Sequence, residues 1–351
     1  MQFLLNKQHG EILFEKESHK KLRPASVTKI MSILLIMEAL DRGDISLNTP
    51  ISCSENASSM GGSQIWLDST ENLTVNEMLK AICIVSANDC TVAMAEHLAG
   101  SEELFVEKMN ERAKELGMND TTFKNCHGID EDGHLTSSYD IALMSKELLQ
   151  NHPQISDYTT IWMDSLRDGQ SELINTNKLV RTYDGITGLK TGSTSLALYN
   201  LSASATRNDL SLIAVVLRAP SPKIRFSEAK LLLDYGFNNF EFKSVSQKNS
   251  FATTIHISKG TENELNLLFE NNNGILLKKG SNSNEIIEEL LINESLEAPI
   301  KRGDILGKIN YYYNDSLKTS VNLIAEKDIE KNSLFNTFKF LSKKWITLLK
   351  I

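Results

Sequence analysis

Hydrophobic residues recur every three or four positions in several segments of the first 240 residues. This spacing places them on one face of a helix, so each segment predicts a helix with a buried side. One stretch is interrupted at residues 86–89 by small and polar residues, which need hydrogen-bond partners if they are buried. The helices predicted in this way span residues 26–40, 75–85, 92–100, 102–116, 139–149 and 226–233.

Strands are predicted where apolar and polar residues alternate, or where short apolar runs flank a turn. Two hairpins follow from these patterns, with turns at His9-Gly10 and at Asn208-Asp209. The glycine-containing segment 185–193 leads into the second hairpin, and glycine within a strand usually marks a bulge or a close backbone approach. The predicted strands are residues 3–5 with 12–14, and residues 199–205 with 210–217.

The pattern changes near residue 243. Short apolar runs then alternate with polar turns, which predicts a small all-β domain over residues 244–328 after a first domain over 1–243. Residues 329–351 combine an apolar stripe with several lysines. This pattern is typical of an amphipathic helix at a membrane interface, and the alternative is a helix that docks on the protein itself.

Composition narrows the possible functions. A chain of 351 residues with 41% apolar and 23% charged residues is ordinary for a folded protein of about two domains. The net charge of −8 argues against general nucleic-acid binding. The four cysteines have no C-x-x-C spacing, which argues against a zinc site, and Cys83 and Cys90 are expected in the core.

No segment is apolar over a length that could span a bilayer, and residues 1–5 are too short an apolar run for the core of a signal peptide. Taken alone, these two observations indicate a cytoplasmic protein.

The first candidate for chemistry is Ser26-x-x-Lys29, at the start of a predicted buried helix. Residues three apart share a helix face, so the Ser26 hydroxyl and the Lys29 amine should be neighbours. A lysine whose pKa is lowered by burial can accept the proton of a nucleophilic serine. The alternative is that Ser26 only caps the helix, and Ser-x-x-Lys also occurs at Ser18 and Ser227.

Two further short motifs accompany it. Ser86-x-Asn88 lies in the polar interruption, where either side chain could instead cap the following helix. Lys190-Thr191-Gly192 occurs once, at the entrance to the second hairpin, and is followed by Ser193.

Two loops leave alternatives open. The Ser/Gly-rich residues 58–63 either line a site or turn the chain. Residues 125–134 hold two histidines and three carboxylates, but the spacing fits neither an EF-hand nor a zincin, so a structural loop is the favoured interpretation.

The order Ser-x-x-Lys, Ser-x-Asn, Lys-Thr-Gly is the motif set of penicillin-binding proteins and class A β-lactamases. The chain more specifically resembles the low-molecular-weight D-alanyl-D-alanine carboxypeptidases, over essentially its whole length, and within them a sporulation-associated branch. The segments that carry the resemblance are 24–31 (PASVTKIM), 59–65 (SMGGSQI), 127–134 (HGIDEDGH) and 188–195 (GLKTGSTS).

The resemblance implies a serine peptidase domain of the penicillin-binding and β-lactamase-like α/β (α+β) type, with a five-stranded sheet flanked by helices. A small all-β C-terminal domain and a terminal amphipathic helix would follow it. It implies removal of the terminal D-alanine from peptidoglycan pentapeptides, without a cofactor or metal. The partners implied are the D-Ala-D-Ala stem peptide, β-lactam antibiotics and a membrane surface, and not nucleic acid.

The resemblance also implies residue roles. Ser26 would be acylated, with Lys29 as its proton acceptor, and backbone N–H groups of Ser26 and Ser193 would bind the oxyanion. Ser86 would relay a proton, Asn88 would position the substrate amide, and the remaining substrate-binding residues would be Lys190, Thr191 and Gly192.

Three alternatives keep the acyl-serine site but change the outcome: a β-lactamase, a D,D-transpeptidase, or a non-catalytic sensor that penicillin acylates. Because peptidoglycan stems are cross-linked outside the cell, the resemblance implies action at the outer face of the cytoplasmic membrane or after secretion, despite the lack of a visible signal peptide. Cys126 departs from the family pattern and is given no function.

Overall fold

The computed structural model describes residues 1–293 and 296–332. Within them the chain divides into two compact units, the first covering residues 1–239 and the second beginning at Phe240. The predicted terminal helix lies mostly outside the described residues, since residues 333–351 are not among them.

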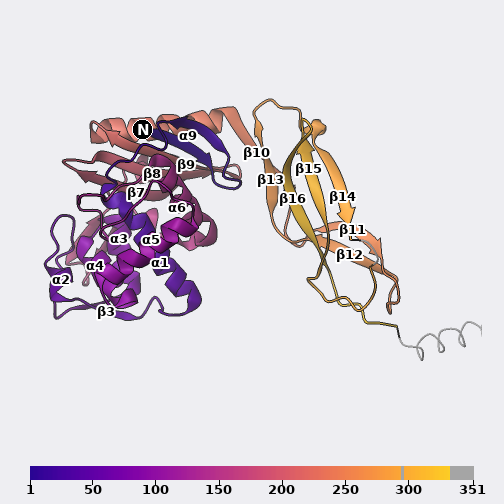
Figure 1. Cartoon of the computed structure of the whole chain (residues 1–351), viewed down its shortest axis with the longest axis horizontal. Helices are drawn as coiled ribbons and strands as arrows, with labels where there is room; N and C mark the ends of the chain where they lie inside the picture. The colour runs from indigo at the N-terminus through magenta and orange to yellow at the C-terminus, as the bar shows by residue number, and fades with distance from the viewer. Residues whose placement is uncertain (294–295, 333–351) are drawn as a thin grey trace, which may run out of the picture. The chain divides into compact units, whose positions relative to one another are not determined.

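The first unit is built on a five-stranded antiparallel sheet in the order β2-β1-β9-β8-β7. Helix α9 packs against β8 and β9 on one face, and α6 packs against β1 and β9 on the other, where α1, α3, α4 and α5 also gather (Figure 1). The sheet strands are β1 (Gln2–Asn6), β2 (Ile12–Lys16), β7 (Ile186–Thr194), β8 (Leu198–Arg207) and β9 (Leu210–Ala219).

Besides the sheet, the first unit has helices and short strands, and all of them except α8 and α9 contribute to one large apolar core against the sheet. They are 3₁₀ helix η1 (Ala25–Thr28), α1 (Lys29–Arg42), β3 (Pro50–Ser52), α2 (Glu55–Ser58), β4 (Asn72–Thr74), α3 (Val75–Ile84), α4 (Asn88–Ala99), α5 (Glu102–Glu115), α6 (Ser138–Asn151), η2 (Pro153–Ile155), α7 (Ser156–Thr159), β5 (Met163–Leu166), β6 (Ser171–Ile174), α8 (Leu179–Thr182) and α9 (Pro222–Asn239).

Helix α9 is longer than the sequence pattern predicts. The prediction that this helix spans only residues 226–233 and ends before Gly236 is wrong, because α9 continues through this glycine to Asn239. A Cβ atom at Gly236 would come within 2.4 Å of a Leu212 methyl carbon, so the close helix–sheet packing needs glycine there. Gly236 therefore does not mark the end of the helix; glycine is needed there because the helix packs closely on the sheet.

The second unit is all-β, as its alternating pattern predicts. It contains a two-stranded sheet, β10-β13, and a five-stranded antiparallel sheet in the order β11-β12-β16-β15-β14, around a separate apolar core. Its elements are β10 (Phe240–Ser246), β11 (Phe251–His256), β12 (Glu264–Phe269), β13 (Asn273–Lys278), η3 (Ser283–Glu285), β14 (Ile287–Ile292), β15 (Ile305–Tyr313) and β16 (Ser316–Ala325).

Candidate active site

Ser26 lies in the 3₁₀ turn η1, immediately before α1 begins at Lys29. Side chains three residues apart eclipse one another in a 3₁₀ helix, and Lys29 Nζ lies 3.3 Å from Ser26 Oγ, as the spacing predicts. Neither Ser26 nor any other side chain caps η1 or α1, so the capping interpretation of this motif is wrong.

Glycines and an asparagine from distant segments hold this turn. A Cβ at Gly128 would lie 2.0 Å from the Ala25 carbonyl oxygen, and one at Gly192 would lie 2.9 Å from the backbone nitrogen of Ser26. The side chain of buried Asn200 on β8 donates to the carbonyls of Arg23 and Pro24, both at 2.9 Å. The backbone around Ser26 is thus clamped between the sheet and the 125–134 loop.

The Lys29 side chain is fully buried. Its amine donates to Asn88 Oδ1 at 2.6 Å and to the His127 carbonyl at 2.7 Å. Burial holds the pKa of Lys29 well below its usual range, and the nearby positive charge of Lys190 lowers it further. Burial therefore shifts Lys29 toward the neutral amine beside the Ser26 hydroxyl.

Ser86 and Asn88 occupy the connection between α3 and α4. Ser86 has φ of 68°, and its hydroxyl is buried without a hydrogen-bond partner among the residues that the structure describes. Asn88 begins α4, and no side chain caps that helix, so the capping alternative is wrong here too. The asparagine amide joins Lys29 to the 58–63 loop, because Asn88 Nδ2 donates to the Gly61 carbonyl at 2.7 Å.

The 58–63 loop contacts Asn88 of the second motif, which favours the interpretation that it lines the candidate site. Besides the Gly61 contact, the Ser63 carbonyl accepts the backbone N–H of Asn88 at 2.7 Å. A buried carboxylate, Asp89, holds the continuation of the loop through the N–H groups of Ile65 and Leu67.

The third motif lies on β7, the edge strand that contacts η1. Lys190 and Thr191 are buried, whereas Ser193 is exposed. Lys190 Nζ donates to the Thr191 carbonyl at 3.0 Å, and the Thr191 hydroxyl donates to Thr176 at 2.7 Å. Burial is the main cause that lowers the pKa of Lys190 to about 7.

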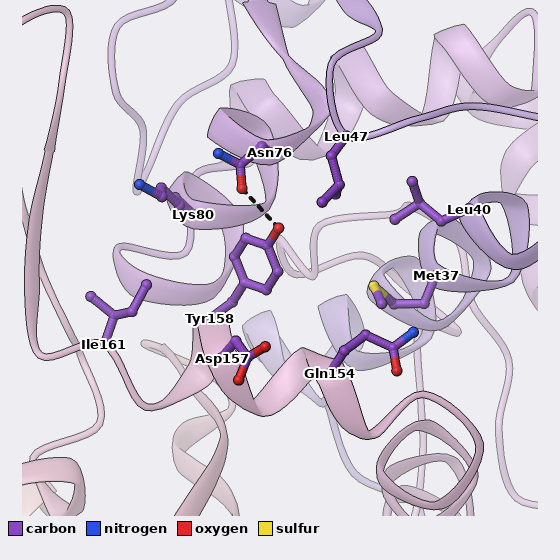
Figure 2. A pocket seen from close by; sticks show the side chains of 9 residues that line it. All are labelled: Met37, Leu40, Leu47, Asn76, Lys80, Gln154, Asp157, Tyr158 and Ile161. Atoms are coloured by element: carbon purple, nitrogen blue, oxygen red, sulfur yellow. Dashed lines mark hydrogen bonds between the residues drawn. The ribbon is translucent and has the colours of Figure 1, made fainter.

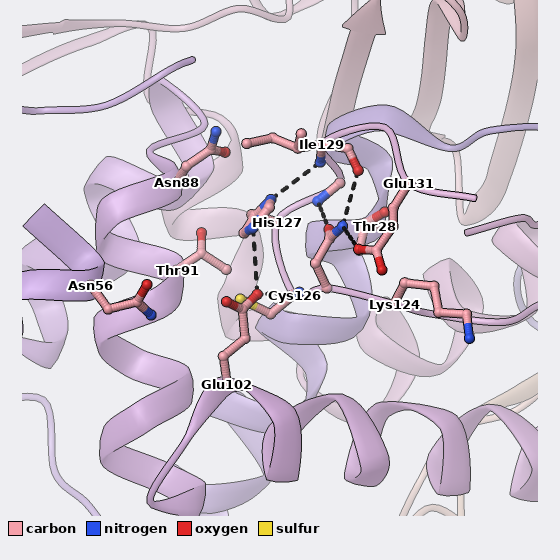
Figure 3. A network of polar contacts seen from close by, with 12 residues as sticks. Thr28, Asn56, Asn88, Thr91, Glu102, Lys124, Cys126, His127, Ile129 and Glu131 are labelled. Carbon is pink, nitrogen blue, oxygen red and sulfur yellow. Dashed lines mark hydrogen bonds and ion pairs between the residues drawn. The ribbon is translucent and has the colours of Figure 1, made fainter. Parts of the chain in front are cut away.

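Sequence reasoning missed several residues that complete this arrangement. The His127 carbonyl reaches Lys29, and Glu102 Oε1 holds the same loop, accepting the Cys126 N–H at 3.0 Å and lying 3.4 Å from His127 Nε2 (Figure 3). Arg225 on α9 donates to the Gly192 carbonyl at 3.3 Å from behind the sheet. No short motif could reveal these contacts, because they join segments far apart in sequence.

The two histidines of the 125–134 loop connect it to neighbouring segments. His134 Nε2 lies 2.8 Å from the Thr28 hydroxyl, and its Nδ1 accepts the Lys124 N–H at 3.0 Å. Burial lowers the pKa of His127 to about 3 and that of His134 to about 4, so both are neutral near pH 7. Among the described residues, no group of three or more candidate metal ligands is found.

A separate cavity of about 370 Å³ lies between α1, α3 and α7 (Figure 2). Its lining includes Met37, Leu40 and Tyr158, whose hydroxyl donates to Asn76 Oδ1 at 2.8 Å. None of the residues of the three motifs lines it, so the candidate chemistry is elsewhere in the first unit.

Fold and site together define a serine acyl-transfer enzyme of the penicillin-binding class. The model of the peptidase family S11, D-alanyl-D-alanine carboxypeptidase, matches residues 2–221, and that of the C-terminal domain of penicillin-binding protein 5 matches residues 240–331. The chain belongs to the D-alanyl-D-alanine carboxypeptidase family.

Individual relatives agree with this assignment. The chain is 40% identical to the D-alanyl-D-alanine carboxypeptidase DacF of Bacillus subtilis, over 97% of this chain and 88% of the relative. Its structure is similar to penicillin-binding protein 5 from Haemophilus influenzae, with a TM-score of 0.76, 29% identity, and coverage of 94% and 97% of the two chains. It is also similar to ampicillin-bound penicillin-binding protein D2 from Listeria monocytogenes, with a TM-score of 0.62, 29% identity, and coverage of 67% and 96%.

Proposed function

We propose that this protein is a serine-type D-Ala-D-Ala carboxypeptidase that removes the terminal D-alanine from peptidoglycan pentapeptide stems through an acyl-enzyme on Ser26. The observation that carries the proposal is the buried Lys29 amine, 3.3 Å from the Ser26 hydroxyl and set among the three family motifs. Removing this alanine limits cross-linking, because the D-Ala-D-Ala bond is the one that supplies the acyl group for it. The identity to Bacillus subtilis DacF is consistent with the expected sporulation-associated role.

Lys29 is placed to act as the general base. Two acceptors, the Asn88 and His127 oxygens, take the two N–H groups of a neutral amine. The remaining lone pair is then available to the Ser26 hydroxyl proton. Ser26 Oγ attacks the carbonyl of the penultimate D-alanine, the peptide C–N bond breaks, and D-alanine leaves with a proton. Water then hydrolyses the ester and restores the serine.

The other motif residues supply binding and charge stabilisation. Backbone N–H groups of Ser26 and Ser193 hold the developing oxyanion. Ser86 passes the proton toward the leaving amine, a role supported by its buried hydroxyl, and Asn88 positions the substrate amide. Gly192 lets β7 approach the Ser26 turn closely.

Lys190 and Thr191 bind the terminal carboxylate of the substrate, and Lys190 must be charged to do so. Its pKa of about 7 therefore predicts that kcat/KM falls as pH rises above about 7, while the charge is retained below. A pH profile measured on free pentapeptide checks this alkaline limb. Lys190→Arg keeps its charge at every pH in this range and should remove the limb, whereas a limb that persists in the variant contradicts the assignment.

β-Lactams are expected to acylate Ser26 as they occupy the same carboxylate and oxyanion sites. Acylation alone does not separate a carboxypeptidase from a β-lactamase, a transpeptidase or a non-catalytic sensor.

Mass spectrometry of the products separates them. Incubation with a pentapeptide ending in D-Ala-D-Ala should yield the tetrapeptide and one D-alanine. Cross-linked dimers would indicate a transpeptidase, and an unchanged peptide with a penicillin-labelled serine would indicate a sensor. Rapid release of hydrolysed penicillin with an unchanged peptide would indicate a β-lactamase.

We further propose that the protein works at the outer face of the cytoplasmic membrane, held there by residues 329–351. No helix among the described residues is long and apolar enough to cross a membrane. The support for a surface anchor is the sequence pattern of Phe335, Phe338 and Trp345 among lysines. Each lysine near anionic headgroups contributes on the order of 1 kcal/mol.

A chain that ends at Lys331 should cleave soluble pentapeptide at the wild-type rate but lose binding to anionic liposomes. Binding of the full chain should weaken with added salt, because part of it is electrostatic. Sedimentation with liposomes measures both effects. Equal partitioning of the two chains would show that this segment is not the anchor.

A further inference from the structure

Asn200 is a polar side chain that lies fully buried on β8. Its Nδ2 donates to the carbonyls of Arg23 and Pro24, both at 2.9 Å, and its Oδ1 accepts the Arg218 N–H at 2.7 Å. The reverse orientation of the amide would set an oxygen against two carbonyl oxygens, so only this orientation is stable. A buried amide is tolerated when its donors and acceptor are paired in this way.

Asn200 also lies at an irregularity of the sheet. The register of β8 with β9 shifts between Tyr199 and Leu201, so that two residues of β9 face Asn200 alone. This is a β-bulge, a feature that re-aims side chains and is frequent beside active sites. On its other side Asn200 pairs with Gly192 of β7. A Cβ atom at Gly192 would lie 2.9 Å from the Pro24 carbonyl oxygen, the same oxygen that Asn200 binds.

The contacts of Asn200 hold a strained part of the turn η1. Ala25 follows the two bound carbonyls and has φ of 50°, in the left-handed region that residues with a Cβ atom rarely adopt. Such a conformation persists only where the surroundings impose it. Asn200 fixes the peptide group before Ala25, and the close packing of Gly128 against the Ala25 carbonyl oxygen restrains the peptide group after it.

The peptide group after Ala25 carries the Ser26 N–H, one of the two proposed oxyanion donors. Peptide groups are planar, so the direction of this N–H relative to the peptide that Asn200 holds depends only on the φ and ψ of Ala25. Release of the Pro24 carbonyl would let Ala25 relax toward negative φ and turn the N–H. The other proposed donor, the Ser193 N–H, follows Gly192, which pairs with Asn200. Asn200 therefore ties the turn of one donor to the strand of the other.

We propose that Asn200 is a positioning residue for acyl transfer, which sets the direction of the Ser26 N–H. When Ser26 Oγ bonds to the substrate carbonyl carbon, the π electrons of the carbonyl move onto its oxygen, and this oxygen needs both N–H groups. The inference rests on the proposed function, because it takes Ser26 as the nucleophile and its N–H as an oxyanion donor. Asn200 acts through the turn and not by contact with the reacting atoms.

Three substitutions test this role. Asn200→Ala removes all three side-chain hydrogen bonds, Asn200→Asp keeps an acceptor for Arg218 but loses both donors, and Asn200→Ser keeps one donor in a smaller side chain. Stopped-flow acylation at increasing concentrations of a fluorescent penicillin separates the acylation rate from the affinity of the non-covalent complex. The Ala and Asp variants should acylate about 10- to 100-fold more slowly, and the Ser variant at an intermediate rate. The non-covalent affinity should change by less than about twofold, because the N–H binds mainly the transition state.

Asn110 on α5 supplies the matched control. Its Nδ2 donates to the carbonyls of Val106 and Phe123, both at 2.9 Å, and its Oδ1 accepts the Phe123 N–H at 2.8 Å. These bonds join α5 to residue 123 and do not hold η1. Asn110→Ala and Asn110→Asp lose the same kinds of hydrogen bond, so they should lower the thermal midpoint but acylate at the wild-type rate.

A peptide boronic acid gives a readout that a purely structural role would not change. Its boron bonds to Ser26 Oγ and forms a tetrahedral adduct that resembles the charged transition state. The affinity for this inhibitor should fall by about the same factor as the acylation rate, whereas the affinity for the tetrapeptide product should not. The fraction of protein labelled by penicillin at long times should stay complete in the Asn200 variants, because a slow site still reacts and an unfolded one does not.

Each outcome supports or overturns the inference. Equal acylation rates for wild type and the Asn200 variants overturn it, as does a loss of rate that the Asn110 variants share. A smaller labelled fraction with an unchanged rate constant gives Asn200 a role in stability alone and also overturns it. If wild type is acylated but releases no D-alanine from a pentapeptide, the proposed carboxypeptidase is wrong while the acylation rates still decide the role of Asn200. If penicillin does not acylate wild type, both proposals are wrong.

Discussion

Ser26→Ala should abolish both release of D-alanine and covalent labelling by fluorescent penicillin. In the proposed mechanism this hydroxyl forms the acyl bond, and removal of a serine nucleophile from an acyl-transfer enzyme costs on the order of 10⁶ in kcat. Labelling is read on a denaturing gel and D-alanine release by mass spectrometry. Because Ser26 is a small side chain that caps no helix, the substitution should leave the thermal midpoint nearly unchanged.

Ser227→Ala is the matched control for this experiment. Ser227 begins another Ser-x-x-Lys sequence, but it is exposed on α9 and its hydroxyl donates to the Ile224 carbonyl at 3.0 Å. This variant should label and turn over as wild type. If Ser26→Ala is still labelled and Ser227→Ala is not, the acylated residue is Ser227 on α9 and the assignment of Ser26 is wrong.

The second large effect is expected at Lys29. Loss of the general base should slow acylation by about 10²- to 10⁴-fold. Lys29→Arg is the sharper variant, because a guanidinium keeps the positive charge and the donors but does not lose a proton in this pH range. Lys29→Met removes the base while approximately preserving the buried volume. Stopped-flow acylation by a fluorescent penicillin measures the rate for each.

The pH profile gives this prediction a second readout. The base must be neutral, so the lowered pKa of Lys29 keeps activity present above that pKa and removes it as pH falls through it. Both variants should lose this acid limb together with the rate. A wild-type acylation rate in either variant, with folding confirmed by circular dichroism, excludes Lys29 as the base.

Lys29→Met also leaves two buried acceptors, the Asn88 and His127 oxygens, without the amine that they bind. Some loss of stability is therefore expected, whereas Lys29→Arg still offers donors to them. Measuring the acylation rate and the stability of both variants separates the chemical role of the lysine from its structural role.

The short motifs could be recognised in the sequence because their geometry is local. Ser26 and Lys29 are three residues apart, and a helical turn brings such residues together whatever the rest of the chain does. The alternation over β8 and β9 and the helical spacing of the core segments predicted the main elements for the same reason. Helix limits were less certain, since Gly236 continues α9 only because the sheet lies against it.

The partners of those motifs depended on the tertiary structure. Asn88 and the His127 carbonyl reach Lys29 across 59 and 98 residues of sequence. The low pKa of the lysine amines also comes from burial, which no local pattern measures.

The sequence by itself thus determined that Ser26 and Lys29 form a neighbouring pair, the order of the motifs and the class of each unit, since these depend on short-range backbone geometry and on which side chains are apolar. Only the tertiary structure decided what surrounds the pair. Those features arise where distant segments pack, and a buried Asp89 or a clamping Asn200 acquires its role only through the neighbours that folding brings to it.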